Sequence, residues 1–156
     1  MRSREPFSLM MVDIDHFKSI NDRFGHAAGD TVLTAVARLL QASVRDGDTA
    51  VRLGGEEFLV LLPTATEAQA VVVMERLRAA VAAADWSDLR LTEPVTVSVG
   101  VATAPEVDER HPEPVVGWRA LFDTADLLLF SAKRSGRNRV RAPGGAAAPL
   151  PGEDDG

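Results

Sequence analysis

Two adjacent glycines, Gly54 and Gly55, stand between two short apolar segments, and this arrangement constrains the fold more than any other feature of the chain. The flanking segments, residues 49–53 and 58–62, have the apolar and β-branched character of strands. A glycine pair between two strands is typical of a tight hairpin, whose turn requires positive φ angles. The two glutamates that follow the glycines are therefore expected at the tip of a β-hairpin.

The apolar pattern along the rest of the chain predicts strands and helices around this hairpin. Residues 7–14 form an apolar run typical of a buried strand, residues 95–101 alternate as a half-buried strand does, and a short last strand is expected at 138–140. Apolar residues at helical spacing predict four helices, over about residues 17–24, 31–44, 67–81 and 118–135. This order predicts an α+β fold in which a mixed central β-sheet of about five strands is flanked by helices.

Polar residues ahead of the predicted helices are interpreted as caps. Asp15 precedes the first helix and Asp30 the second, and an aspartate in that position accepts a hydrogen bond from a free backbone N–H. Thr64 and Glu67 are spaced as a capping box for the third helix, and Gly136 is placed to end the fourth.

Length and composition indicate one domain followed by a tail. The chain has 156 residues, of which 46% are hydrophobic, and this suits one globular domain with a proper core. Residues 1–141 are assigned to that domain. Residues 142–156 are rich in Ala, Gly and Pro, end in acids and have little to bury, so a disordered tail is expected there.

Charge and cysteine content exclude several classes of function. A formal net charge of −6 disfavours bulk binding to nucleic acid or to an anionic membrane, although residues 133–141 hold a basic cluster that could meet phosphates. The chain has no cysteine, which excludes a thiolate metal site and a cysteine nucleophile. With no signal-peptide pattern and no apolar run long enough to span a membrane, a cytoplasmic location is expected.

Three carboxylates are expected to meet beside the hairpin. Asp13 ends the first predicted strand, and if this strand pairs beside the hairpin, Asp13 converges with Glu56 and Glu57. A hard divalent ion such as Mg²⁺ would relieve their repulsion, since it prefers oxygen ligands and leaves positions for substrate phosphates. The bare backbone at Gly54 and Gly55 would also let a ligand approach closely. Taken alone, the GGEEF segment is more typical of an ordinary surface turn with solvated glutamates, and it is the neighbouring Asp13 that favours a site.

With these features in place, the sequence resembles the GGDEF family, the diguanylate cyclases that join two GTP molecules into cyclic di-GMP. The resemblance extends from about Leu9 to Val140. Its motifs are VDIDHFKSIND at 12–22, FGHAAGD at 24–30, GGEEF at 54–58, SVGVA at 98–102 and AKRSGRNRV at 132–140. Because a shared fold alone says little about activity, the ordered series of motifs carries the resemblance.

The resemblance implies a role for each matching residue. It implies that Asp13, the Ile14 carbonyl and Glu56 bind Mg²⁺ (or Mn²⁺), with Glu57 near a second metal, and that Glu56 promotes loss of the ribose 3′-hydroxyl proton. The GTP-binding positions that it implies are Asn21 and Asp30 for guanine with His26 beside them, Lys133 and Arg137 for the triphosphate, and Lys18, Gly54 and Gly55 nearby. For Asp30 the helix cap remains an equal alternative. For Lys133 the alternative is a favourable charge at a helix C-terminus, and for Arg137 it is a solvated charge after the helix.

The implied reaction is attack by the 3′-oxygen of one GTP on the α-phosphorus of another, with loss of pyrophosphate. One site can hold only one GTP, and the product is two-fold symmetric, so a homodimer is expected for catalysis. Arg45 and Asp48 form an RxxD pattern that matches the family's inhibitory site for cyclic di-GMP, with Arg76 as a third contact from a neighbouring chain. Without the resemblance the RxxD pair would be an ordinary solvated ion pair.

The chain departs from the family pattern at its start. The helix and the LTGLxNR-like segment that usually precede the first strand are absent, so the chain is interpreted as a fragment or as beginning downstream of the natural start, and a sensory domain outside it is expected upstream. Two alternatives to a cyclase stay open. One is a catalytically silent signalling module that binds cyclic di-GMP, and the other is a nucleic-acid-binding domain that uses the basic cluster.

Overall fold

A central mixed sheet organises the chain in a computed structural model, which describes residues 5–91, 93–105, 110 and 117–146. The strands run in the order β2-β3-β1-β4-β5-β6. Their bounds are β1 Phe7–Ile14, β2 Thr49–Gly54, β3 Glu57–Pro63, β4 Val97–Ala104, β5 Val140–Ala142 and β6 Gly145–Ala146. β4 and β5 are parallel, and the other neighbouring pairs are antiparallel. The predicted mixed sheet is therefore confirmed.

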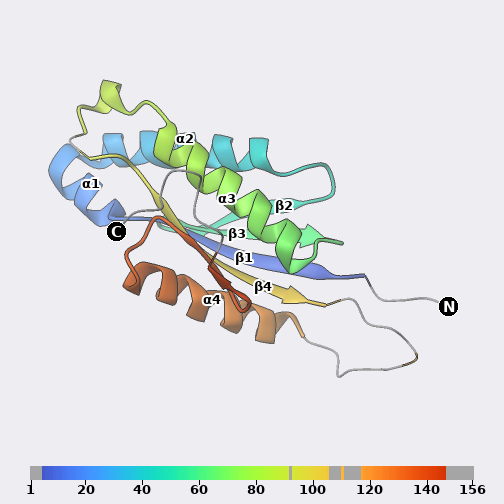
Figure 1. Ribbon diagram of the computed structural model, residues 1–156. Coiled ribbons are helices and arrows are strands. Elements are labelled where there is room, and N and C mark those ends of the chain that lie inside the picture. The colour runs from blue at the N-terminus through green and yellow to red at the C-terminus, as the bar shows by residue number, and fades with distance from the viewer. Residues whose placement is uncertain (1–4, 92, 106–109, 111–116, 147–156) are drawn as a thin grey trace.

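Helices cover both faces of this sheet (Figure 1). On one side lie α2 (His26–Ser43) and α3 (Glu67–Ala83), with the short α1 (Phe17–Phe24) against α2, and α4 (Trp118–Arg134) covers the opposite face. A 3₁₀ turn, η1 (Ser87–Leu89), follows α3. Among the described residues no helix is long and apolar enough to cross a membrane. The layers are those of the predicted α+β fold.

The alternation of side chains along β1 divides the core into two parts. Met10, Val12 and Ile14 join the cluster under α2 and α3, whereas Leu9 and Met11 join the cluster under α4. Successive residues of a strand point to opposite faces, so one apolar run serves both layers. This burial on both faces explains why the first strand is continuously apolar rather than alternating.

The packing of α4 depends on Gly100 in β4. A Cβ atom at this position would collide with the backbone of α4, at the Ala125 carbonyl and the Leu129 nitrogen. The missing side chain therefore lets the helix backbone approach the sheet closely. In the sheet Gly100 pairs with Met11, so the close contact with α4 lies beside the middle of β1.

The predicted caps at Asp15 and Asp30 are wrong. The N-cap of α1 is His16, without a side-chain cap bond, and Asp15 is buried behind it. α2 begins at His26, directly after Gly25, so Asp30 lies inside the helix. Gly25 has a φ of 89°, which lets a single residue separate the two helices. α2 therefore begins at His26, five residues before the start at residue 31 that the apolar spacing predicted.

The predicted capping box of α3 is displaced by two residues. Thr66 and Gln69 form it instead of Thr64 and Glu67, each accepting a hydrogen bond from the other's backbone N–H. Thr64 has a φ of 69° and belongs to the turn that leaves β3. Both pairs have the required spacing, so only the path of the turn selects between them.

Strands occupy the region where the tail was expected to begin. β5 lies at 140–142 rather than 138–140, because residues 136–138 still belong to the turn that ends α4. β6 pairs back onto β5, and Ala142 is buried. A tail cannot therefore begin at Ala142. Residues 147–156 lie outside the described residues, as does most of the predicted loop at 105–114.

Candidate active site

The hairpin tip lies against the end of β1. In the sheet register Glu57 stands opposite Asp13, and the Ile14 N–H donates to the Glu56 carbonyl over 3.2 Å. This pairing is the one on which the predicted meeting of the three acids depended. The backbone therefore brings Asp13, Ile14 and the two glutamates to one edge of the sheet.

The turn of the hairpin is built by Gly54 and Gly55. Their φ angles are 154° and 53°. A Cβ on either glycine would meet no atom within 4 Å, so glycine is required here for its conformation and not for lack of space. The Arg52 Nε donates to the Gly55 carbonyl over 2.9 Å and holds the turn. Both glycines are exposed and leave open backbone beside the acids.

Asp13 is a buried carboxylate paired with a lysine of α4. Its side chain is 4% exposed, and the Lys133 Nζ donates to its Oδ2 over 2.7 Å. Burial is the largest influence on the pKa of Asp13, which is raised from 3.8 to about 6. Lys133 acts against this rise, while the charges of Glu56 and Glu57 add to it. The charges of the two glutamates thus act on Asp13, and a cation already faces this buried carboxylate.

The side chains of the three acids do not converge as closely as their backbones. Within the part of the chain that the structure describes, no three acidic, histidine or cysteine side chains are grouped so that they could hold a metal ion. Glu56 and Glu57 are partly exposed, and without a cation their charges favour separation from Asp13. The chemistry of the donors still fits Mg²⁺, since carboxylate and backbone carbonyl oxygens are its preferred protein ligands.

The predicted guanine-binding residues lie on α1 and at the start of α2, and Lys18, expected near the triphosphate, is also on α1. Asn21 is half-buried, whereas Lys18, His26 and Asp30 are exposed. A Cβ at Gly29 would collide with the side-chain amide of Asn21, so α2 passes directly over this amide one residue before Asp30. The structure therefore brings Asn21 next to the stretch of α2 that carries Asp30.

The end of α4 carries the predicted triphosphate-binding residues. Lys133 is in its last turn, and Arg137 follows in an exposed turn where Gly136, Arg137 and Asn138 all have positive φ. The Arg137 N–H donates to the Ala132 carbonyl over 2.9 Å, which is the bond of a Schellman-type helix ending. Gly136 thus ends the helix as predicted.

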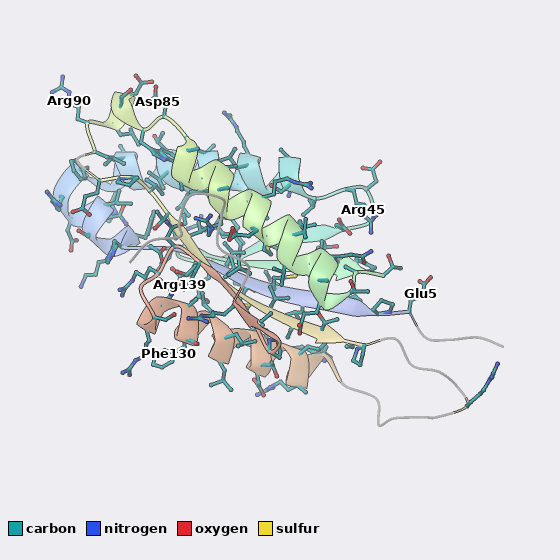
Figure 2. All side chains as sticks on the ribbon, in the orientation of Figure 1. Glu5, Arg45, Asp85, Arg90, Phe130 and Arg139 are labelled. Carbon is teal, nitrogen blue, oxygen red and sulfur yellow. The ribbon has the colours of Figure 1, made fainter. Side chains whose placement is uncertain are left out.

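A separate cavity of about 580 Å³ lies between α2, β3 and α3. Arg45 and Asp48 line it, and the Arg45 N–H donates to Asp48 Oδ2 over 3.0 Å. The Arg45 side chain is 71% exposed and that of Asp48 only 6%. Arg76, expected from a neighbouring chain, lines the cavity within the same chain. Figure 2 shows Arg45 where α2 passes into β2, away from Arg139 beyond the end of α4.

Two buried charged residues near the site, Asp15 and Arg78, were not among the site residues predicted from the sequence. They are 4% and 6% exposed, and both bind Asn138 in the turn after α4. A signal for Arg78 was present, because it stands four residues after Met74 on the apolar stripe of α3, where a solvated arginine would not lie. Asp15 carried a weaker signal, since an acid before a helix is usually a cap.

Comparison with known proteins finds the same family that the sequence motifs resemble. A sequence model of the family described as diguanylate cyclase, GGDEF domain, matches residues 1–139. Diguanylate cyclase A of Treponema denticola is 39% identical over 137 residues, which is 88% of this chain and 35% of that protein. Diguanylate cyclase DgcM of Escherichia coli K12 is 42% identical over 138 residues, which is 88% of this chain and 31% of that protein. The chain thus spans about a third of the length of these relatives.

Solved structures of GGDEF domains share the fold. The GGDEF domain of DgcB from Caulobacter crescentus, in complex with c-di-GMP, has a TM-score of 0.77 and 32% identity, covering 88% of this chain and 77% of that one. The active GGEEF domain of a diguanylate cyclase from Vibrio cholerae has a TM-score of 0.76 and 31% identity, covering 88% of this chain and 83% of that one. Sheet, helices and hairpin thus belong to a known architecture.

Proposed function

Because this chain belongs to the GGDEF family of diguanylate cyclases, we propose that it joins two GTP molecules into cyclic di-GMP and releases pyrophosphate. The observation that carries the proposal is the register that sets the GGEEF turn beside the buried Asp13, with Lys133 facing the same carboxylate. Acids suited to a cation and a base suited to phosphates thus share one edge of the sheet. This is the combination that a triphosphate bound with a metal requires.

The proposed cofactor is Mg²⁺ or Mn²⁺. Asp13, the Ile14 carbonyl and Glu56 would hold it, with Glu57 near a second ion. Asp13 has two carboxylate oxygens, so it can bind a cation at one while Lys133 donates to the other. When bound, the metal supplies charge neutralisation at the phosphates and lowers the pKa of the ribose hydroxyl.

GTP would lie between the hairpin and the ends of three helices. Asn21 and Asp30 recognise the guanine, with His26 beside them. The exposed backbone of Gly54 and Gly55 supports the nucleotide. The triphosphate is bound by Lys133 and Arg137 with Lys18. Asp30 lies inside α2 and is not its N-cap, so the helix-cap role that the sequence allowed for Asp30 does not compete with guanine binding by its exposed carboxylate.

In the proposed reaction Glu56 accepts the 3′-hydroxyl proton of one GTP. The 3′-oxygen then bonds to the α-phosphorus of the second GTP, and the bond from that phosphorus to the bridging oxygen breaks to release pyrophosphate. The same step in the opposite direction closes the ring. Two chains related by a two-fold axis, each with one GTP, supply both directions, so the active species is a homodimer. A regulatory domain outside this chain would control how often the two sites meet.

The cavity at Arg45 is assigned to inhibition by the product. An arginine fork can donate two hydrogen bonds to a guanine edge or a phosphate, and the Asp48 carboxylate can accept from guanine. Arg76 adds a second positive charge to the same cavity. This cavity also favours the second candidate function, a silent module that binds cyclic di-GMP without making it.

One incubation with GTP and Mg²⁺, followed by chromatography, tests the proposal. Wild-type protein should form cyclic di-GMP, and folded Glu56→Ala protein should form none. Glu5→Ala is the matched control, because Glu5 is exposed and lies far from the hairpin in Figure 2. If the wild type forms no product but binds cyclic di-GMP in calorimetry, the silent module replaces the cyclase. If it does neither, both functions are wrong.

A further inference from the structure

The turn that carries Arg137 has an unfavourable backbone conformation. Gly136, Arg137 and Asn138 have φ angles of 126°, 63° and 47°. Glycine adopts such angles freely, but an arginine followed by an asparagine does so at a cost. A conformation of this kind persists only where the surrounding structure determines it, and it is often found at functional sites. The bonds that determine it are therefore informative.

Asp15 holds the turn from the side of β1. The Asn138 N–H donates to its Oδ2 over 3.0 Å. The Thr96 hydroxyl donates to the same oxygen over 2.7 Å, and the Ser98 hydroxyl donates to Oδ1 over 2.7 Å. Asp15 is buried and both of its carboxylate oxygens accept in these bonds, which tie the turn to the end of β1 and the start of β4.

Arg78 holds the same residue from α3. Its Nη1 donates to the Asn138 Oδ1 over 2.9 Å, and its Nε donates to both carboxylate oxygens of Glu75, over 2.6 Å and 3.1 Å. Glu75 thus orients the guanidinium, and the guanidinium orients the asparagine. Two buried charged residues therefore hold Asn138: Asp15 binds its main chain and Arg78 binds its side chain.

We propose that Asp15 and Arg78 are positioning residues, which fix the turn so that Arg137 reaches the triphosphate of a bound nucleotide. This inference rests on the proposed function. Neither residue touches the substrate; both act through Asn138. The backbone bond from Arg137 to Ala132 sets one end of the turn, and the Asn138 anchors set the other. Loosening the anchors should therefore weaken binding of the outer phosphates and leave binding of guanine unchanged.

Asn138→Gly is the sharpest variant. Glycine keeps the left-handed conformation and the N–H that Asp15 accepts, but it removes the acceptor that Arg78 uses. Arg90→Gly is the matched control, because Arg90 also has positive φ, at 55°, and ends η1 away from Arg139 in Figure 2. Since Asn138 is exposed, the variant should fold.

Asp15→Ala removes the second anchor, and Asp15→Asn is its conservative partner. An asparagine oxygen can accept from the Asn138 N–H while its amide donates to a hydroxyl, so the geometry can survive. Rescue by asparagine would show that the hydrogen bonds, and not the charge, position the turn. Thermal unfolding of each variant reports whether it is folded.

The measurement is calorimetry with GTP and with GMP, each in Mg²⁺. In Asn138→Gly and Asp15→Ala the Kd for GTP should rise about tenfold, the effect of losing one hydrogen bond to a charged group. The Kd for GMP, which lacks the outer phosphates, should change by less than about twofold. Arg90→Gly and Asp15→Asn should resemble the wild type with both nucleotides.

The outcomes separate this inference from the proposed function. If the wild type forms cyclic di-GMP but Asn138→Gly binds GTP as tightly as the wild type does, the positioning role is wrong and the proposed function stands. If GTP and GMP binding weaken equally, the two residues only maintain the fold, and the inference is overturned. If the wild type neither binds GTP nor forms product, the proposed function fails and the inference fails with it.

Discussion

Replacing Asp13 with asparagine should make the metal-free protein more stable at neutral pH while abolishing cyclase activity. The Asp13 side chain is 4% exposed, and burial raises its pKa from 3.8 to about 6 despite the Lys133 partner. A raised pKa means that the folded protein holds this proton more tightly than the unfolded chain does. Ionised Asp13 therefore costs folding free energy. Asparagine resembles the protonated acid in shape and carries no charge to desolvate.

The size of the gain follows from the pKa shift. One pKa unit corresponds to about 1.4 kcal/mol, so the rise from 3.8 to about 6 is worth at most about 3 kcal/mol. Lys133 is 32% exposed, and solvent around it reduces the effect, so a gain of about 1–3 kcal/mol is expected at neutral pH. Below pH 3.8 the acid is protonated in both states and the gain vanishes; the gain grows between pH 3.8 and about 6 and stays at its full value above that range.

Urea unfolding of the metal-free proteins, repeated across this pH range, measures the gain. Asp85→Asn is the control of opposite sign, because hydrogen bonds from Ser87 lower the pKa of Asp85 from its ordinary value of 3.8. Ionised Asp85 therefore stabilises the fold above pH 3.8, and this stabilisation is lost as the pH falls through the lowered pKa. Asp85→Asn should therefore gain nothing at neutral pH. A less stable Asp13→Asn protein at neutral pH would refute the reasoning, since the Asp13–Lys133 pair would then be net stabilising. Added Mg²⁺ should stabilise the wild type and not Asp13→Asn.

Three further outcomes are expected. Gly100→Ala should lower the free energy of unfolding by about 1–3 kcal/mol in urea titrations, because the new Cβ would meet the backbone of α4; an unchanged value would mean that the helix can shift at no cost. Asp30→Asn should leave stability unchanged but raise the KM for GTP and weaken discrimination against ATP, and unaltered nucleotide preference would remove its guanine role. Arg45→Ala should abolish calorimetric binding of cyclic di-GMP and product inhibition while initial rates stay normal; equal binding would leave Arg45 and Asp48 as an exposed ion pair.

Features that depend on short-range chemistry were predictable from the sequence. The bounds of β1 and α1 agree with those expected from the apolar pattern, and the glycine hairpin forms between the expected strands. Short-range rules failed where they allowed two answers. Thr64 with Glu67 and Thr66 with Gln69 both satisfy the spacing of a capping box, and Asp15 satisfies that of an N-cap, yet the tertiary structure used the second pair and buried the aspartate.

The sequence by itself determined which residues could carry the chemistry. The acids of VDID and GGEEF and the glycines between the strands were identified because charge and positive φ are properties of single residues. The tertiary structure alone decided what those residues meet. Asp13 faces Lys133 only because α4 packs on the face of the sheet to which Leu9, Met11 and Asp13 point, and periodicity within a strand cannot indicate which helix will cover which face.

The same reason explains the turn after α4. Asn138 is bound by Arg78, 60 positions earlier, and by Asp15, 123 positions earlier. These contacts exist because the strand order places β1, β4 and β5 side by side, and because α3 packs against β5 on the face of the sheet opposite to α4. A hydrogen bond between residues so far apart leaves no periodic trace in the sequence. Local chemistry therefore supplied the charged groups, and the packing of sheet and helices selected their partners.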